Sequence, residues 1–336
     1  MINPHTQALH ALGQSLWLDN ITRELLDNGT LARYIAELSV TGLTSNPTIF
    51  EHAIGDGNAY DAQIGALTQA GRSGEDLFFA LAEQDLRRAA DLFRPVHDAT
   101  GGVDGWVSLE VSPLLVDDTA GTILAAASLP AKAARPNVFI KIPGTPAGVM
   151  AIEDSIFAGV PINVTLLFSR EQYRAVAEAY MRGIERRIEA GLDPKVESVA
   201  SLFVSRWDVA VKDQVPADHR NRLGIAIARR TYKAYRELLA APRWRKLAEA
   251  GAHPQRLLWA STGMKDPQGR DTLYVETLAA PDTIDTIPDK TLLAFADSAS
   301  PPSRASTAPI LPWSAKARSV LSGMVSMVSG AASVST

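Results

Sequence analysis

The stretch N-V-F-I-K-I-P at residues 137–143 has the alternation of a β-strand. Successive residues of a strand face opposite sides, so three aliphatic residues share one face while Asn137, Phe139 and Lys141 share the other. An apolar face of this kind is typical of a sheet that helices cover. The stretch therefore predicts a strand whose lysine points away from the covering helices.

Seven other short runs rich in β-forming residues are separated by longer segments, and several repeat this pattern. With the first stretch they make eight, at residues 15–20, 42–47, 105–111, 137–143, 161–168, 198–205, 256–262 and 272–278. In the run 161–168, Ile162, Val164 and Leu166 are predicted on the apolar face, and Asn163 and Thr165 on the other. Glu110 and Asp19 take the polar position in their own runs.

The segments between the runs have helical periodicity. Ser169 and Gln172 form a capping box, and apolar residues follow at helical spacing through Ile188. Strands that alternate with helices predict a parallel sheet. A chain of 336 residues fits either two ordinary domains or one large barrel. The shared apolar face favours the closed barrel, an α/β fold of the (β/α)8 or TIM type with additional helices, whose polar groups converge at one end of the axis.

Composition divides the chain into a long globular part and a short end. We predict one barrel domain over residues 1–297, because no low-complexity tract interrupts the rhythm there. Residues 298–313 are rich in Ser, Pro and Ala and predict a linker. Residues 314–336 predict a last helix and tail, with Ser314 as the amino-terminal cap.

Charge and cysteine content exclude several classes of function. The chain has 33 Lys and Arg against 37 Asp and Glu, a net charge of −4, which gives no general attraction to nucleic acid or anionic lipid. It has no cysteine, which excludes disulfides, thiolate metal sites and cysteine nucleophiles. With neither a signal peptide nor an apolar span of membrane length, we expect a cytoplasmic protein without membrane partners.

Lys141 is the first candidate for chemistry. A lysine in mid-strand between two isoleucines is expected to be buried, and burial favours a neutral amine that can attack a carbonyl and form a Schiff base. Schiff-base chemistry also needs proton transfers, for which Asp19 and Glu110 are the candidates. Taken singly, a strand lysine is more often structural or paired, and each carboxylate is as well explained by an ion pair or strand-end cap.

Polar residues at the other predicted strand ends complete the candidate site. They can hydrogen-bond a polyhydroxylated substrate, and they are Asn46, Asn163, Thr165 and Ser201.

At this point the sequence resembles the transaldolases. The segments that carry the resemblance are GLTSNPTIF at 42–50, VSLEV at 107–111, NVFIKIPGT at 137–145, INVTLLFS at 162–169, SLFVSR at 201–206, WASTG at 259–263 and DTLYV at 271–275. They occur in the family's order over roughly residues 10–297.

The resemblance implies a class I aldolase barrel that acts in the non-oxidative pentose phosphate pathway. Its reaction moves a dihydroxyacetone unit from sedoheptulose 7-phosphate or fructose 6-phosphate to glyceraldehyde 3-phosphate or erythrose 4-phosphate. Sugar phosphates are then the only partners expected. The resemblance implies no cofactor and no metal, because a protonated imine is the electron sink.

The resemblance also assigns roles to single residues. Lys141 matches the Schiff-base lysine, and Glu110 the acid/base carboxylate that works through a water held by Thr165. Asp19 matches the residue that handles the proton of the C4 hydroxyl. Asn46 and Asn163 match groups that bind the dihydroxyacetone moiety.

The phosphate is expected beyond the sixth strand. Arg206 is the main candidate, since a guanidinium binds two phosphate oxygens at once, and Ser201 and Phe203 are further substrate contacts. A salt bridge to Asp208 is the alternative role for Arg206. Many relatives have a second arginine near the position of Gly263, whereas here Lys265 is the nearest candidate.

Two other functions stay open from the sequence. One is a Schiff-base sugar-phosphate aldolase that cleaves without transferring, and the other is a barrel that binds sugar phosphates without catalysis. The oligomeric state cannot be read from these residues.

Overall fold

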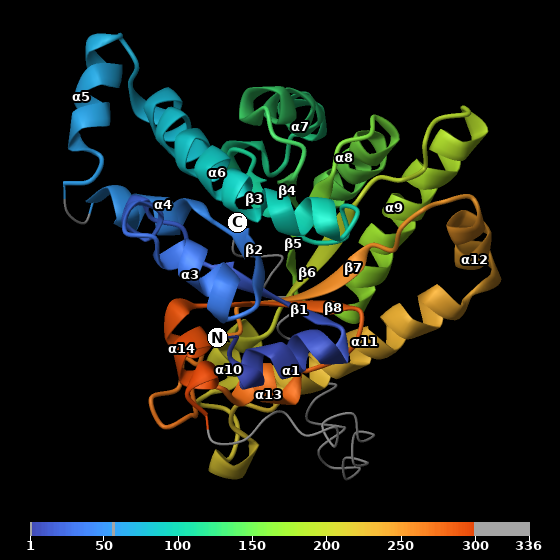
Figure 1. Ribbon diagram of the computed structural model, residues 1–336. Coiled ribbons are helices and arrows are strands. Elements are labelled where there is room, and N and C mark those ends of the chain that lie inside the picture. The colour runs from blue at the N-terminus through green and yellow to red at the C-terminus, as the bar shows by residue number, and fades with distance from the viewer. Residues whose placement is uncertain (1, 56–57, 299–336) are drawn as a thin grey trace.

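Eight parallel strands close into a barrel at the centre of the molecule (Figure 1). The computed structural model describes residues 2–55 and 58–298. Each strand pairs with the next in chain order and the eighth pairs with the first, which confirms the predicted (β/α)8 fold. The strands are β1 (Gln14–Asp19), β2 (Val40–Thr44), β3 (Val107–Glu110), β4 (Val138–Pro143), β5 (Ile162–Leu167), β6 (Ser198–Phe203), β7 (Arg256–Ala260) and β8 (Thr283–Ile287).

Helices surround the barrel and outnumber the strands. They are α1 (Pro4–Leu12), α2 (Arg23–Asp27), α3 (Thr30–Glu37), α4 (Pro47–Gly55), α5 (Asp61–Gln69), α6 (Gly74–Ala99), α7 (Thr119–Ala133), α8 (Pro146–Phe157), α9 (Arg170–Glu189), α10 (Ser205–Val211), α11 (Leu223–Ala240), α12 (Pro242–Glu249), α13 (Leu273–Thr277) and α14 (Asp289–Ala296). Two short 3-10 turns occur at Pro113–Leu115 and Ala217–His219. The connection from β2 to β3 holds α4, α5 and α6, and α5 lies at the edge of the molecule away from the barrel (Figure 1).

Because side chains alternate along each strand, there are two apolar layers, one between the barrel and its helices and one inside the barrel. Val138, Ile140 and Ile142 of β4 belong to the large core that the helices cover. Phe139 lies inside the barrel, where its ring stacks on Trp106 with centroids 4.1 Å apart. The parity predicted for 137–143 is therefore confirmed, and the same parity places Lys141 inside the barrel.

Buried polar groups close the amino-terminal end of the barrel. The Arg256 guanidinium donates to the Ser15 hydroxyl at 2.7 Å, and the Asp104 carboxylate accepts from Ser15 and from the Trp17 indole. A buried charge is tolerated only when such partners satisfy it. With this end filled, a substrate can reach the barrel interior only from the carboxyl ends of the strands.

The helix predicted after residue 168 is confirmed as α9, together with its start. The Ser169 hydroxyl accepts from the Gln172 amide nitrogen at 3.1 Å, and the Gln172 side chain accepts from the Phe168 nitrogen at 2.7 Å. Tyr173 and Val176, which follow at helical spacing, are fully buried.

The prediction for the eighth strand was wrong. Residues 272–278 contain α13, and the strand is β8 further along the chain. Tyr274, Val275 and Leu278 are the buried residues of that segment, at a spacing that suits one face of a helix. Three of the five residues of β8, Thr283, Asp285 and Thr286, are polar, so its sequence lacks the apolar run that marks the other strands.

Leu166 does not lie on the apolar face of β5. It has a positive φ of 59° and its side chain is 39% exposed, while the pairing between β5 and β6 shifts between Val164 and Leu167. The irregularity gives Leu167 the buried outward position that parity predicted for Leu166. A bulge of this kind changes the parity of every residue that follows it.

The described structure ends at Ser298. The predicted linker at 298–313 and the predicted helix and tail at 314–336 lie outside the described residues, except for Ser298. The barrel itself ends with α14.

An acidic side chain is buried between the barrel and its helices. Asp285 of β8 is inaccessible and pairs in register with Leu16 and Trp259, which both face the helices. The nearby Thr262 hydroxyl donates to the Thr286 carbonyl, and neither Asp285 oxygen has a hydrogen-bond partner among the described residues. Burial raises the pKa of Asp285 to about 7.

We expect this carboxyl group to make stability depend on pH. Its pKa is raised on folding, so the folded protein holds an extra proton and loses stability as the pH rises from about 4 to about 7. The Asp285→Asn variant has no ionisable group at this position and does not lose this stability. The unfolding free energy of the variant minus that of wild type should therefore rise by up to about 4 kcal/mol as the pH goes from 4 to 8.

Urea unfolding across this pH range measures the effect. Asp61→Asn on α5 is the matched control, because Asp61 is exposed. Parallel pH profiles for wild type and Asp285→Asn would contradict the assignment.

Candidate active site

The predicted catalytic residues lie at the carboxyl ends of neighbouring strands. Glu110 pairs in register with Lys141, and Lys141 pairs with Asn163. On the two strands before β3, Asp19 of β1 pairs with Thr44 of β2. In TIM barrels, residues at these strand ends form the active site.

Lys141 is held inside the barrel by two acceptors. Its side chain is 9% exposed, and its Nζ donates to the Ser45 carbonyl oxygen at 2.8 Å and to Glu110 Oε2 at 3.1 Å. Ile140 and Ile142 fix the strand on either side, because both are fully buried under the helices. The ion pair that the sequence left open for Lys141 is therefore present, and its partner is the predicted acid/base residue.

This contact allows a proton to move between Lys141 and Glu110. The resemblance implies that Glu110 acts through a water, whereas in this structure its carboxylate touches the amine directly. A carboxylate at this distance can accept a proton from the amine and leave it nucleophilic.

Asp19 has a different environment from Glu110. Its Oδ1 accepts from the Thr44 hydroxyl at 2.9 Å. Burial raises the pKa of Asp19 above its ordinary value, while the positive charges of Lys141 and Lys265 and the hydrogen bond from Thr44 oppose the rise. A carboxyl group with a raised pKa is suited to exchange protons with a substrate hydroxyl near neutral pH.

A hydrogen-bonded chain lies beside Lys141. The Asn163 amide donates to the Ser108 hydroxyl at 3.0 Å and accepts from the Ser201 hydroxyl at 2.7 Å. Thr165 follows Asn163 on the same face of β5 and is almost fully buried. Three of the predicted polar residues, Asn163, Thr165 and Ser201, thus lie on adjacent strands inside the barrel.

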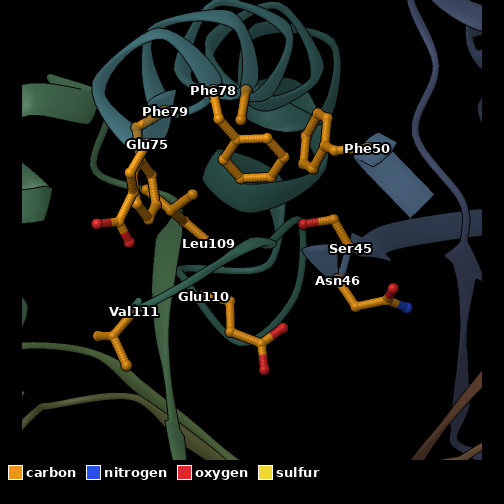
Figure 2. Close-up of a pocket in the computed structure, with 10 residues that line it drawn as sticks. Ser45, Asn46, Phe50, Glu75, Phe78, Phe79, Leu109, Glu110 and Val111 are labelled. Carbon is orange, nitrogen blue, oxygen red and sulfur yellow. The ribbon is translucent and has the colours of Figure 1, made fainter. Parts of the chain in front are cut away.

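The oxygen and the nitrogen of the Asn46 side chain differ in their contacts. Its Oδ1 accepts from the Ile49 nitrogen at 3.0 Å at the start of α4. This bond orients the side chain, so that Nδ2 is the group that a ligand would meet. Asn46 and Glu110 line the same pocket, as Figure 2 shows.

Two of the predicted substrate contacts, Phe203 and Arg206, lie at the end of β6 and just after it. The Phe203 ring is half-buried, 5.4 Å from that of Phe168. Arg206 is exposed in the first turn of α10 and has no ion-pair partner among residues 2–55 and 58–298. The salt bridge considered for Arg206 is not present, because Asp208 accepts from the backbone nitrogens of α11 and from the Tyr274 hydroxyl.

Lys265, which follows β7 in the chain, lies near the predicted catalytic residue Asp19. Its Nζ approaches Gly263, and its charge lowers the pKa of Asp19. It also lines a surface pocket with Ser205 and Arg220. The structure thus brings Lys265 into the electrostatic field of the site.

Three residues in contact with the predicted site residues were not themselves predicted. The Ser45 backbone carbonyl accepts from Lys141, and the hydroxyls of Thr44 and Thr286 are hydrogen-bonded at 2.7 Å beside Asp19. Backbone groups carry no sequence signal. Thr44 was detectable in principle, since it lies next to Ser45 and Asn46 in the 42–50 segment.

Within the part of the chain that the structure describes, no three or more histidines or acidic residues converge in a way that could hold a metal ion. The described helices include none with the length and apolar character needed to cross a membrane.

Comparison with known proteins identifies the family. The family model described as transaldolase/fructose-6-phosphate aldolase matches residues 16–326. The chain belongs to this family. Its relatives include transaldolase 1 of Streptomyces avermitilis, 47% identical over 85% of this chain and 78% of that protein. The transaldolases of an Arthrobacter species and of Mycolicibacterium smegmatis are 48% and 46% identical over 87% and 88% of this chain, and over 81% and 82% of their own lengths.

We expect the hydrogen-bonded hydroxyls of Thr44 and Thr286 to lower the pKa of Asp19. The Thr44 hydroxyl has one proton, so while it donates to Asp19 it can accept from Thr286. We expect Thr286→Val to weaken this support of the carboxylate. The acid limb of the pH profile for kcat/KM should then move up by about 0.5 to 1 pH unit.

Thr283→Val is the matched control for this measurement. Thr283 is a buried threonine at the amino end of the same strand, where its hydroxyl donates to the Ala280 carbonyl. Its replacement should leave the acid limb in place. An unchanged acid limb in Thr286→Val would show that the threonine pair does not support Asp19.

Proposed function

We propose that this protein is a transaldolase that moves a dihydroxyacetone unit between sugar phosphates through a Schiff base on Lys141. Family membership supports the activity. The observation that carries the mechanism is the contact of a buried lysine amine with the Glu110 carboxylate and the Ser45 carbonyl. Family membership also supports our assignment of the protein to the cytoplasm and to the non-oxidative pentose phosphate pathway.

The first step is condensation. The ketone C2 of the open-chain ketose phosphate is attacked by Lys141 Nζ after Glu110 accepts a proton from the amine. The C2 oxygen takes one proton from the attacking nitrogen to give the carbinolamine and a second from Glu110, leaves as water, and a protonated imine forms. Thr165 is our candidate for holding this water, because it lies on the strand next to that of Lys141.

The second step is cleavage of the bond between C3 and C4. Asp19 accepts the proton of the C4 hydroxyl, C4 becomes an aldehyde, and the electrons of the broken bond move to the imine to give an enamine. The raised pKa of Asp19 suits it to hold this proton. Asn46 and Asn163 are the donors and acceptors for the hydroxyls of the retained three-carbon unit.

The enamine then attacks the aldehyde of a second sugar phosphate, and Asp19 returns its proton to the new C4 oxygen. Water hydrolyses the imine and releases the product. The buried position of Lys141 supports transfer, because few bulk water molecules can protonate an enamine attached there.

Binding of the phosphate is assigned to the residues after β6 and β7. Arg206 is exposed and without an ion-pair partner in the described chain, and Lys265 lies beside Gly263. Their positive charges suit a phosphate dianion at the edge of the barrel. Phe203 and Ser201 lie between this edge and Lys141 in strand order and are proposed as further contacts.

A cleaving aldolase is the second candidate, since the family description itself includes fructose-6-phosphate aldolase. The two reactions share the imine and the cleavage step. They differ in whether the enamine meets an aldehyde or a proton.

One experiment tests both the covalent step and its outcome. Borohydride reduction in the presence of fructose 6-phosphate should attach a three-carbon unit to Lys141, as peptide mass spectrometry will show. With erythrose 4-phosphate as acceptor, sedoheptulose 7-phosphate should form, and without an acceptor little free dihydroxyacetone should appear. Lys141→Arg should reduce turnover by more than about a thousandfold.

Lys195→Arg is the matched control, because Lys195 is exposed and its Nζ donates to the Gly101 carbonyl, away from the strand ends of the site. It should retain full activity. Labelling at another residue would reject the mechanism, and acceptor-independent release of dihydroxyacetone would favour the cleaving aldolase.

A further inference from the structure

Leu166 is an apolar residue in an unfavourable position at the carboxyl end of β5. Its φ of 59° lies in the left-handed region, where most side chains cost free energy and glycine or asparagine is preferred. It is also 39% exposed, which is uncommon for a leucine of a barrel strand. Another residue type would avoid both costs, so the fold alone does not explain a leucine here.

The bulge in β5 determines which way this residue lies. Val164 and Leu167 are fully buried in the core between the barrel and its helices. In a regular strand one residue separates two outward positions, but Thr165 and Leu166 both lie between these two, where the pairing with β6 shifts. Leu166 does not belong to the core that the helices cover. It therefore lies with Thr165 on the side of the barrel mouth.

Packing against β4 holds the bulge in place. The nitrogen of Gly144, which follows β4, donates to the Thr165 carbonyl at 2.8 Å. A side-chain carbon at Gly144 would clash with Leu167, so Leu167 fills the space beside this glycine. Leu166 cannot turn into the core without displacing Leu167, and its side chain stays at the end of the strand.

The end of β5 is adjacent to the reacting amine. Lys141 of β4 pairs in register with Asn163, three residues before Leu166. The Lys141 Nζ contacts Ser45 and Glu110 at the ends of β2 and β3, so the amine also lies toward the carboxyl ends of the strands. A side chain at the end of the adjacent strand can therefore cover an adduct on this amine.

The next strand continues the apolar edge. Phe203, at the end of β6, packs against the apolar cluster inside the barrel, and its ring lies 5.4 Å from that of Phe168. The ends of β1 and β3 carry the carboxylates Asp19 and Glu110 instead. The apolar residues at β5 and β6 offer no hydrogen bond to water, whereas the groups that exchange protons lie across the mouth.

We propose that Leu166 determines whether the enamine on Lys141 is transferred or protonated, because its side chain excludes bulk water from the barrel mouth. This inference rests on the proposed function, since it needs the enamine. In the competing reaction a proton from water adds to the enamine carbon C3 and gives an imine. A second water then hydrolyses the imine and releases dihydroxyacetone and the free amine. Leu166 slows the first of these steps.

Leu166→Asn tests this role. Asparagine is close to leucine in size and is tolerated in the left-handed region, so the backbone should keep its conformation while the amide admits water. The readout is a ratio of two rates with fructose 6-phosphate: release of dihydroxyacetone without an acceptor, over formation of sedoheptulose 7-phosphate at saturating erythrose 4-phosphate. The ratio should rise about tenfold above that of wild type. A purely structural defect would lower both rates and leave their ratio unchanged.

Two further substitutions at this position sharpen the test. Leu166→Gly removes the side chain and the backbone strain together, and its ratio should rise at least as much as that of Leu166→Asn. Leu166→Met keeps an apolar side chain and should keep the wild-type ratio.

Leu192→Asn is the matched control. Leu192 is 44% exposed and lies between α9 and β6, at the amino-terminal end of the barrel. Its replacement makes the same chemical change far from the mouth, so the ratio should equal that of wild type.

The outcomes separate this inference from the proposed function. If wild type gives neither a borohydride adduct on Lys141 nor transfer, the proposed function is rejected and this inference with it. If wild type transfers but neither Leu166→Asn nor Leu166→Gly raises the ratio, this inference alone is wrong. It is equally wrong if Leu166→Met or Leu192→Asn raises the ratio as much, or if the only change in Leu166→Asn is a higher KM for erythrose 4-phosphate.

Discussion

A closed parallel sheet forces alternate side chains of each strand into the barrel interior, and the site depends on this constraint. Lys141 lies inside because its neighbours Ile140 and Ile142 must lie outside, under the helices. Inside, the amine is surrounded by strand ends rather than by bulk water. The same constraint places Glu110 and Asn163 beside it in register.

The two carboxylates are distinguished by what surrounds them. Glu110 touches the amine and can exchange a proton with it, whereas Asp19 is bonded to Thr44 and burial raises its pKa. Groups with different proton affinities in one site can take different parts in a reaction. Here one is suited to form and hydrolyse the imine, and the other to break the carbon–carbon bond.

Much of the fold could be predicted from alternation, because a strand buried on one face leaves a period of two in the sequence. Alternation does not identify a buried strand that contains polar residues, such as Asp285 in β8. It also assigns the wrong face after a bulge, as at Leu166 in β5. Among the site residues, side chains at strand ends could be found. The Ser45 carbonyl and the Thr286 hydroxyl could not, since each depends on contacts between segments distant in sequence.

The most direct test of this account is a crystal structure of the protein reduced by borohydride in the presence of fructose 6-phosphate. We predict continuous density from Lys141 Nζ into a three-carbon unit inside the barrel, with Asp19 and Glu110 both in contact with it. Density on any other residue, or an adduct that leaves Asp19 or Glu110 out of contact, would contradict the arrangement on which the mechanism rests.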